Sequence, residues 1–326
     1  MSGLTLSLID QAVSFLEGKI RKTPMEFSAV LSECLKVPVY LKLECLQTTG
    51  SFKVRGALFY LSTLKAEERD SGVAACSAGN HGLGVAFAAK ELGVPCTLFV
   101  PKSVDQAKYE KMLKLGATVK KSKFSGYDDT LEWAEEEAAK DHLHLISAFD
   151  DARIMAGNGG SLGYEILKEV PAVQNVVVPV GGGGLCSGIA YSIKAERPNA
   201  RIIGCQHLES PALHLSLQSG VAVTRLTSVE TVAGGIEGGI GERCFEILKH
   251  RIDEVALLSE QEIIKAFCWI LEHHQYLIEP TAAVGVAACL FNKISHLNGP
   301  MVIILTGRNV SFQTLRTLVA FERNDR

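Results

Sequence analysis

Four consecutive glycines, Gly181 to Gly184, form the most unusual turn in the sequence. They follow the apolar run Val176–Val180, which is typical of a buried strand, and precede a predicted helix that begins near Leu185. Residues without a Cβ let backbone N–H groups approach an anion, and the helix N-terminus adds positive potential. The turn therefore predicts a phosphate-binding loop. A merely tight turn is the alternative, although two glycines would usually suffice for one.

The same loop does not match the common nucleotide-binding patterns. The dinucleotide motif GxGxxG fails, because Ser187 stands where a third glycine would have to follow Gly182 and Gly184. The sequence also lacks GxxxxGKS and GxxxxGKT, the motifs that hold a nucleoside triphosphate. We therefore expect a small cofactor that carries a phosphate rather than a nucleotide.

Lys53 is the candidate nucleophile. It follows the turn Thr48 to Ser51 and opens an apolar segment that is typical of a helix start. A lysine amine that is partly desolvated in such a place holds its proton less tightly and becomes nucleophilic. Taken alone, a lysine in such a place is more often an ordinary surface residue than a nucleophile.

The segment Thr49–Ala57, TGSFKVRGA, resembles the cofactor-lysine motif of the serine/threonine dehydratase and serine racemase family. Members of this family have the tryptophan-synthase β-type fold. Further matches occur in the family's order, namely SAGNHG at 77–82, the tetraglycine, EPTA at 279–282 and TGRN at 306–309. The resemblance extends from about Ile20 to Leu315, and it implies pyridoxal 5'-phosphate as the cofactor.

The resemblance also implies a role for each matching residue. Lys53 would bind the cofactor as a Schiff base and later remove the α-proton of the substrate. Phe52 would pack against the pyridine ring, and Asn80 would hydrogen-bond its 3-oxygen. The tetraglycine would hold the phosphate. The substrate carboxylate would bind a loop of five residues near a helix start: Ser77, Ala78, Gly79, Asn80 and His81.

Thr306 matches the small hydroxyl or thiol residue that lies beside the pyridine nitrogen in the family. A carboxylate there would keep the ring protonated and make it a strong electron sink. A neutral hydroxyl disfavours a full carbanion and therefore favours elimination over transamination. We expect dehydration and deamination of a small β-hydroxy amino acid, such as L-threonine or L-serine, to a 2-oxo acid and ammonia.

Several departures from the family bear on the substrate. Ala78 stands where serine racemases have a serine that serves the opposite face of the substrate, so a dehydratase is favoured over an amino-acid racemase. Arg153 and Arg308 are unusual at their positions. If either faces the substrate, a second carboxylate could bind it, which leaves 3-hydroxyaspartate dehydration as an alternative. Gln206 and Ala212 replace the acids of the family's divalent-cation site, so we predict no metal there.

Three other functions remain open at this stage. The pattern Gly159 to Gly163 formally matches GxSxG and would make Ser161 the nucleophile of an α/β-hydrolase, but a polar segment precedes it instead of a buried strand. A non-catalytic binding protein of the same fold would lack a reactive lysine. Within the pyridoxal enzymes, β-replacement is a further alternative.

Composition narrows the class of protein. The 326 residues carry a net charge of −3, which argues against nucleic-acid and anionic-membrane partners. Neither a signal peptide nor an apolar run of spanning length is recognisable, so a cytoplasmic location is expected. The nine cysteines show no regular metal or disulfide spacing. The resemblance implies a homodimer and, since no regulatory extension follows, no feedback control through such a domain.

Apolar runs alternate with helical patterns along nearly the whole chain, which predicts parallel sheets with right-handed crossovers. We expect an α/β fold of two domains, each an open, mostly parallel, twisted sheet flanked by helices. Residues 1–71 and 148–326 would form a large cofactor-binding domain, and residues 72–147 a small domain with the substrate loop. The predicted strands are Val39–Glu44, Val73–Cys76, Cys96–Val100, His142–Ser147, Asn175–Val180, Arg201–Gln206 and Met301–Thr306. The predicted helices are Gly82–Leu92, Gln106–Leu115, Tyr127–Lys140, Met155–Lys168 and Glu260–His274.

Overall fold

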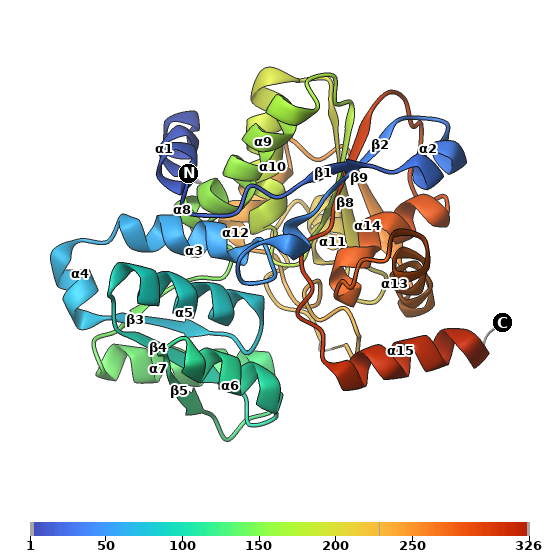
Figure 1. Ribbon diagram of the computed structural model, residues 1–326. Coiled ribbons are helices and arrows are strands. Elements are labelled where there is room, and N and C mark those ends of the chain that lie inside the picture. Colours follow the sequence, from blue (N-terminus) through green and yellow to red (C-terminus); the bar gives the residue numbers. More distant parts are fainter. Residues whose placement is uncertain (1–2, 228, 325–326) are drawn as a thin grey trace.

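The computed structural model describes residues 3–227 and 229–324, which fold around two separate β-sheets flanked by helices (Figure 1). The larger sheet has six strands in the order β1-β2-β10-β7-β8-β9, and only β1 runs antiparallel to its neighbour. Its strands are β1 (Met25–Phe27), β2 (Val39–Lys42), β7 (Asn175–Pro179), β8 (Arg201–His207), β9 (Glu254–Leu258) and β10 (Met301–Ile304).

The smaller sheet has four parallel strands in the order β5-β4-β3-β6. Its strands are β3 (Val73–Cys76), β4 (Cys96–Val100), β5 (Thr118–Lys121) and β6 (His144–Leu145). All four come from one continuous stretch of the chain, which lies between β2 and β7 of the larger sheet. The two sheets are therefore built from different parts of the sequence.

Helices connect the strands in both parts. Those of the first half are α1 (Leu6–Leu16), α2 (Ala29–Leu35), α3 (Lys53–Ser62), α4 (Ala66–Ser71), α5 (Asn80–Leu92), α6 (Gln106–Lys114) and α7 (Tyr127–Lys140), with a 3₁₀ turn η1 at Glu44–Leu46. Those of the second half are α8 (Ala152–Met155), α9 (Ser161–Glu169), α10 (Gly184–Glu196), α11 (Ala212–Ser219), α12 (Glu242–Leu248), α13 (Glu260–His274), α14 (Pro280–Leu290) and α15 (Phe312–Asn324). A π-helical turn, η2 (Ala156–Gly160), joins α8 to α9.

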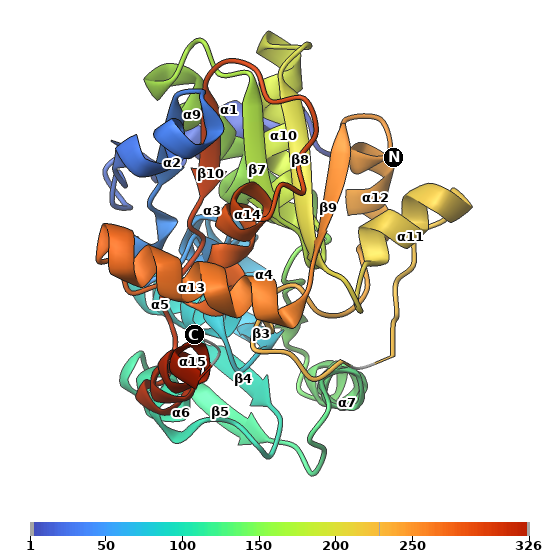
Figure 2. The same cartoon turned by 90° about the vertical axis from the view of Figure 1, so that its right-hand side faces the viewer.

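Alternation along the strands divides the core of the larger sheet into two faces. Val177 and Ile303 belong to one apolar cluster together with residues of α13 and α14, and these helices cover one face (Figure 2). Val176 and Val302 belong to a second cluster with residues of α1, α9, α10 and α12. Burial on both faces explains why these strands are almost entirely apolar.

The smaller sheet is covered in the same way. Its first cluster joins β3 and β4 to α5 and to α3, whose Val54, Leu58 and Leu61 are buried there. The second cluster packs Phe99 of β4 against α7. Helix α3, which begins at Lys53, therefore contributes to the core of the smaller sheet although it precedes residue 72.

The expected fold class is confirmed, and each predicted strand overlaps an observed one. Three strands were missed. β1 and β5 are short edge strands, and two of the four residues in β5 are lysines. β9 reads Glu-Val-Ala-Leu-Leu, which is rich in helix formers. The predicted helix Met155–Lys168 is interrupted by η2, where the run Ala-Gly-Asn-Gly-Gly widens the turn.

Candidate active site

The tetraglycine follows β7 at its carboxyl end, and its last residue, Gly184, begins α10, one residue before the predicted helix start. Gly183 has a φ of +94°, which favours glycine. A Cβ on Gly182 would lie 2.2 Å from the ring of Phe149, and one on Gly181 would lie 2.3 Å from the carbonyl oxygen of Gly235. Within the described residues, the N–H groups of Gly181, Gly182 and Gly183 donate to no protein acceptor. The loop thus combines unpaired donors, a helix start and no space for side chains, which fits a bound phosphate.

Lys53 lies next to this loop. Its Nζ donates a hydrogen bond of 2.8 Å to the carbonyl oxygen of Ala148, the residue before Phe149. Phe149 in turn packs closely on Gly184, since a Cβ added to Gly184 would lie 2.7 Å from the Phe149 carbonyl oxygen. Residues 148–149 therefore connect the lysine amine to the tetraglycine, so that both lie in one site.

Burial makes the Lys53 amine easier to deprotonate. Desolvation lowers its pKa from 10.5 to about 8, because the buried site disfavours the charged ammonium. The charges of Cys244 and Glu279 act in the opposite direction but do not cancel the effect. At this pKa an appreciable fraction of the amine is neutral near pH 7, as covalent capture of an aldehyde requires.

Thr306 joins the site through the backbone of the lysine segment. Its carbonyl oxygen accepts a 3.2 Å hydrogen bond from the N–H of Phe52. The Phe52 ring lies beside the lysine, with its centroid 5.3 Å from Nζ. The hydroxyl of Thr306 is buried and has no hydrogen-bond partner among the described residues. An orphaned neutral hydroxyl is costly unless a bound group satisfies it, so this atom fits the pyridine nitrogen of a cofactor.

Asn80 is the first residue of α5, which packs on the smaller sheet. Its side chain is hydrogen-bonded to two residues next to the larger sheet. Its Nδ2 donates to Oε1 of Glu279 at 2.7 Å, and its Oδ1 accepts from Nδ2 of Asn309 at 2.7 Å. Both partners lie in motifs that the sequence matched, EPTA and TGRN, but the sequence assigned neither of them a role. The position of Asn309, just after the predicted strand Met301–Thr306, could have pointed to it, whereas Glu279 follows a predicted helix and only the EPTA match marks it.

The predicted carboxylate loop follows β3. Ser77 Oγ accepts from the N–H of Gly79 at 3.1 Å, which stabilises a sharp turn before α5. Ala78 is partly buried, and its methyl group brings no hydroxyl to the site. His81 is buried, and its Nε2 lies 3.2 Å from the carbonyl oxygen of Ile146. Burial lowers the pKa of His81 to about 3, so its imidazole is neutral.

The two arginines considered for a second carboxylate differ in their surroundings. Arg153 makes an ion pair of 3.0 Å with Asp151 and stacks on the ring of Tyr60, 3.8 Å from its centroid. The positive charge of Arg153 is therefore already paired with the carboxylate of Asp151. Arg308 is exposed.

Ser161 and Gln206 have structural surroundings. Ser161 is buried within α9 and donates to the carbonyl oxygen of Gly157 at 2.6 Å, so it is not the exposed serine of a hydrolase elbow. Gln206 donates to the carbonyl of Val180 at 3.2 Å and accepts from the N–H of His214 at 3.1 Å. Ala212 is buried at the start of α11. The predicted absence of a metal at this position stays a prediction.

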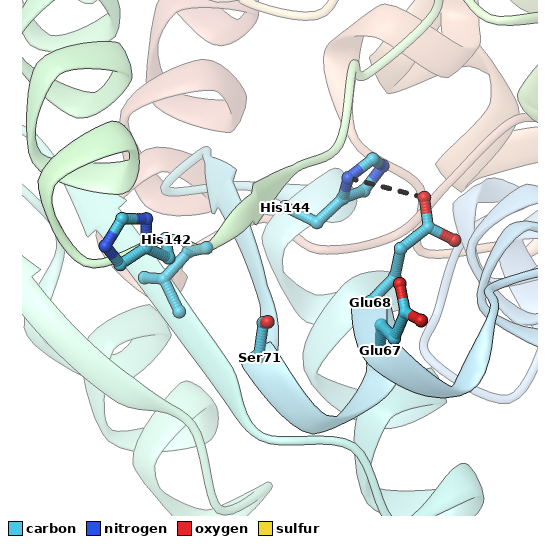
Figure 3. A pocket seen from close by; sticks show the side chains of 6 residues that line it. Glu67, Glu68, Ser71, His142 and His144 are labelled. Carbon is cyan, nitrogen blue, oxygen red and sulfur yellow. Dashed lines mark ion pairs between the residues drawn. The ribbon is translucent and has the colours of Figure 1, made fainter.

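A separate pocket of about 200 Å³ lies beside β6, and none of the predicted site residues lines it (Figure 3). Its polar lining includes Glu68 and His144, with His144 Nδ1 4.0 Å from a Glu68 oxygen. Figure 3 shows these side chains on the rim, where they face each other. No lysine, glycine loop or orphaned hydroxyl contributes to this pocket, so it is not the candidate site.

The chain is similar to known pyridoxal-phosphate enzymes in sequence and in fold. Residues 16–307 match the family described as pyridoxal-phosphate dependent enzyme. An L-threonine ammonia-lyase of Geobacter sulfurreducens is 38% identical over 316 residues, covering 97% of this chain and 78% of that protein. The structure of maize serine racemase matches with a TM-score of 0.91 and 27% identity, covering 99% of this chain and 98% of its own. The structure of threonine deaminase isoform 2 from Solanum lycopersicum matches with a TM-score of 0.87 and 32% identity, covering 98% of this chain and 89% of its own. The chain therefore belongs to the pyridoxal-phosphate-dependent enzyme family, and pyridoxal phosphate is its cofactor.

Proposed function

We propose that the enzyme is an ammonia-lyase that eliminates water from a small β-hydroxy amino acid, L-threonine or L-serine, and releases a 2-oxo acid and ammonia. The observation that carries this proposal is the Lys53 amine, whose pKa is lowered to about 8 beside a tetraglycine loop with unpaired N–H groups. Relatives named L-threonine ammonia-lyase and threonine dehydratase, at 35–38% identity, support the reaction class.

Each predicted site residue has a proposed task. Bound pyridoxal phosphate supplies an electron-withdrawing ring that acidifies the α-carbon of the amino acid. Lys53 would hold the cofactor covalently and, once released, take the α-proton on Nζ. The β-hydroxyl then takes up a proton and leaves as water, and hydrolysis of the product gives the 2-oxo acid and ammonia.

The remaining residues bind and orient. The N–H groups of Gly181, Gly182, Gly183 and Gly184 would hold the phosphate at the start of α10. Phe52 would pack on the ring, and the neutral hydroxyl of Thr306 would meet its nitrogen. The loop formed by Ser77, Ala78, Gly79, Asn80 and His81 would bind the substrate carboxylate. The neutral state of His81 leaves this task to backbone N–H groups rather than to an imidazolium charge.

The structure bears on the alternatives. Ala78 offers no hydroxyl for a second face of the substrate, which disfavours racemisation even though serine racemases are structural neighbours. Arg153 is paired with Asp151, so a second carboxylate, as in 3-hydroxyaspartate, would have to bind Arg308. The buried Ser161 removes the support for a hydrolase.

We further propose a homodimer in the cytoplasm, with a large domain of residues 1–71 and 148–326 and a small domain of residues 72–147. This division is supported by the strands, because all strands of the smaller sheet come from the proposed small domain and all strands of the larger sheet from the proposed large domain. Helix α3 belongs to the large domain by sequence but packs on the smaller sheet, so it lies at the contact between the two domains. None of the helices within the described residues combines the length and the hydropathy that a bilayer-spanning segment requires.

The test is a screen for 2-oxo acid release with both enantiomers of serine, threonine and 3-hydroxyaspartate. We expect turnover with an L-hydroxy amino acid, and we expect Lys53→Ala to abolish it while the protein stays folded. Lys90→Ala, which changes an exposed lysine in α5, is the matched control and should behave as wild type. Absence of 2-oxo acid from every substrate, or full activity of Lys53→Ala, would reject the proposal.

A further inference from the structure

Asn80 belongs to the part of the molecule built on the smaller sheet, but both of its side-chain partners come from segments next to the larger sheet. Glu279 precedes α14, and Asn309 follows β10. Glu279 accepts from Asn80 Nδ2, and Asn309 donates to Asn80 Oδ1, each at 2.7 Å. Asn309 Nδ2 also donates to the carbonyl oxygen of Thr49 at 2.9 Å, which fixes its own orientation.

The space for this contact depends on Gly307. A Cβ there would lie 2.3 Å from Oε1 of Glu279 and 3.2 Å from Nδ2 of Asn80. The Gly307 carbonyl also accepts the backbone N–H of Glu279 at 3.0 Å. The carboxylate of Glu279 is thus held against the turn that follows β10, where it accepts from Nδ2 of Asn80.

Burial raises the pKa of Glu279, and the hydrogen bond from Asn80 opposes that shift by favouring the ionised form. The ionised carboxylate can only accept, so the amide of Asn80 presents Nδ2 to it. The reverse orientation would place Oδ1 against the carboxylate and Nδ2 against the amide donor of Asn309, which is unfavourable at both ends. In the observed orientation, one N–H of Asn80 is used by Glu279 and the other has no acceptor among the described residues. That second N–H is the donor available to a cofactor oxygen.

We propose that Glu279 is a positioning residue that fixes the amide orientation of Asn80, so that Asn80 presents an N–H donor, and not its carbonyl oxygen, to the 3-oxygen of pyridoxal phosphate. The proposal rests on the role given to Asn80 in the proposed function. Asn309 acts with Glu279 by occupying the other end of the amide. Glu279 acts through Asn80 and needs no contact of its own with the cofactor.

The experiment measures cofactor affinity by equilibrium dialysis of pyridoxal phosphate against cofactor-free protein, with no turnover involved. We expect Glu279→Ala to raise the Kd by about tenfold or more, which corresponds to about 1.4 kcal/mol. Glu279→Gln should have a smaller effect, because the side-chain carbonyl oxygen of glutamine can still accept from Nδ2 of Asn80. Glu260→Gln is the matched control. Its carboxylate also accepts a backbone N–H, at 2.7 Å from Val232, but it does not contact Asn80.

A double-mutant cycle separates positioning from a general loss of structure. If Glu279 acts through Asn80, Glu279→Ala adds less than twofold to the Kd once Asn80→Ala is present. Independent, multiplicative losses in the double variant would overturn the proposal, and so would a Kd of Glu279→Ala within twofold of wild type. Unfolding of each cofactor-free variant by denaturant reports stability separately.

Asn309→Asp provides a second route if Glu279→Ala does not fold. The new carboxylate replaces a donor by an acceptor, and so competes with Glu279 for Nδ2 of Asn80. We expect a rise in Kd that disappears in the Asn80→Ala background, and an unchanged Kd would count against the proposal. Because none of these measurements uses the amino-acid substrate, a failure of elimination activity in the wild type would leave them interpretable.

Discussion

The Lys53 amine should capture pyridoxal phosphate with a pH dependence that an ordinary lysine does not show. Burial lowers its pKa from 10.5 to about 8. Raising the pH removes the proton, so the neutral, reactive fraction grows from about 9% at pH 7 to about 91% at pH 9. The same fraction of an unperturbed lysine grows from about 0.03% to about 3%. The rate of capture should therefore rise about tenfold between pH 7 and pH 9 and then level off.

The assay mixes cofactor-free protein with pyridoxal phosphate and follows the visible absorbance, with borohydride trapping to locate the adduct at Lys53. A free lysine amide in the same buffers corrects for titration of the aldehyde itself. Lys53→Ala should show no adduct at this position. If the corrected rate keeps rising tenfold per pH unit up to pH 10, Lys53 titrates as an exposed lysine and the argument from burial is wrong.

Three further substitutions test the surroundings of the site. Gly182→Ala places a methyl carbon 2.2 Å from the Phe149 ring, so bound cofactor should be lost on dialysis even where the protein still folds. Arg55→Met leaves its buried glutamate partner, Glu44, without a cation and should cost about 3–5 kcal/mol in denaturant unfolding. Lys140→Met, which removes an exposed ion pair, is the control and should leave the unfolding midpoint unchanged. Thr306→Val removes an unpaired buried hydroxyl, so the cofactor-free protein should gain about 1 kcal/mol of stability while dialysis shows weaker cofactor binding.

The sequence predicted those parts of the structure whose signals are local. Val176 to Val180 and Met301 to Leu305 are continuous apolar runs, and burial on both faces of a parallel sheet requires such runs. The four glycines 181–184 predicted a tight loop, because few other residues permit the positive φ of Gly183 and the close packing at Gly181 and Gly182. The order of the motifs along the chain indicated the family, which no single local pattern could have indicated.

What the sequence could not predict depends on contacts between distant segments. Ala148 and Phe149 lie between the lysine amine and the tetraglycine, but they act through a carbonyl oxygen and a ring face, which no motif specifies. The roles of Glu279 and Asn309 are likewise visible only when three segments meet at Asn80. β9 was missed because its composition favours a helix, and pairing with β8 overrides that preference.

Lys53 is held by close backbone packing of its helix, whereas Asn80 is held by side-chain hydrogen bonds. A movement of the two sheets relative to one another would therefore affect the two residues differently. The backbone of Lys53 is packed closely on the smaller-sheet side, since a Cβ on Gly84 would lie 3.1 Å from its carbonyl oxygen. Helix α3 is also locked to η2, where the N–H of Gly56 donates to Asn158 at 2.8 Å. Asn80, by contrast, reaches the other half through two side-chain hydrogen bonds. A separation of the sheets would therefore break the two hydrogen bonds of Asn80, whereas α3, which packs on both halves, would have to lose its contacts either with α5 or with η2.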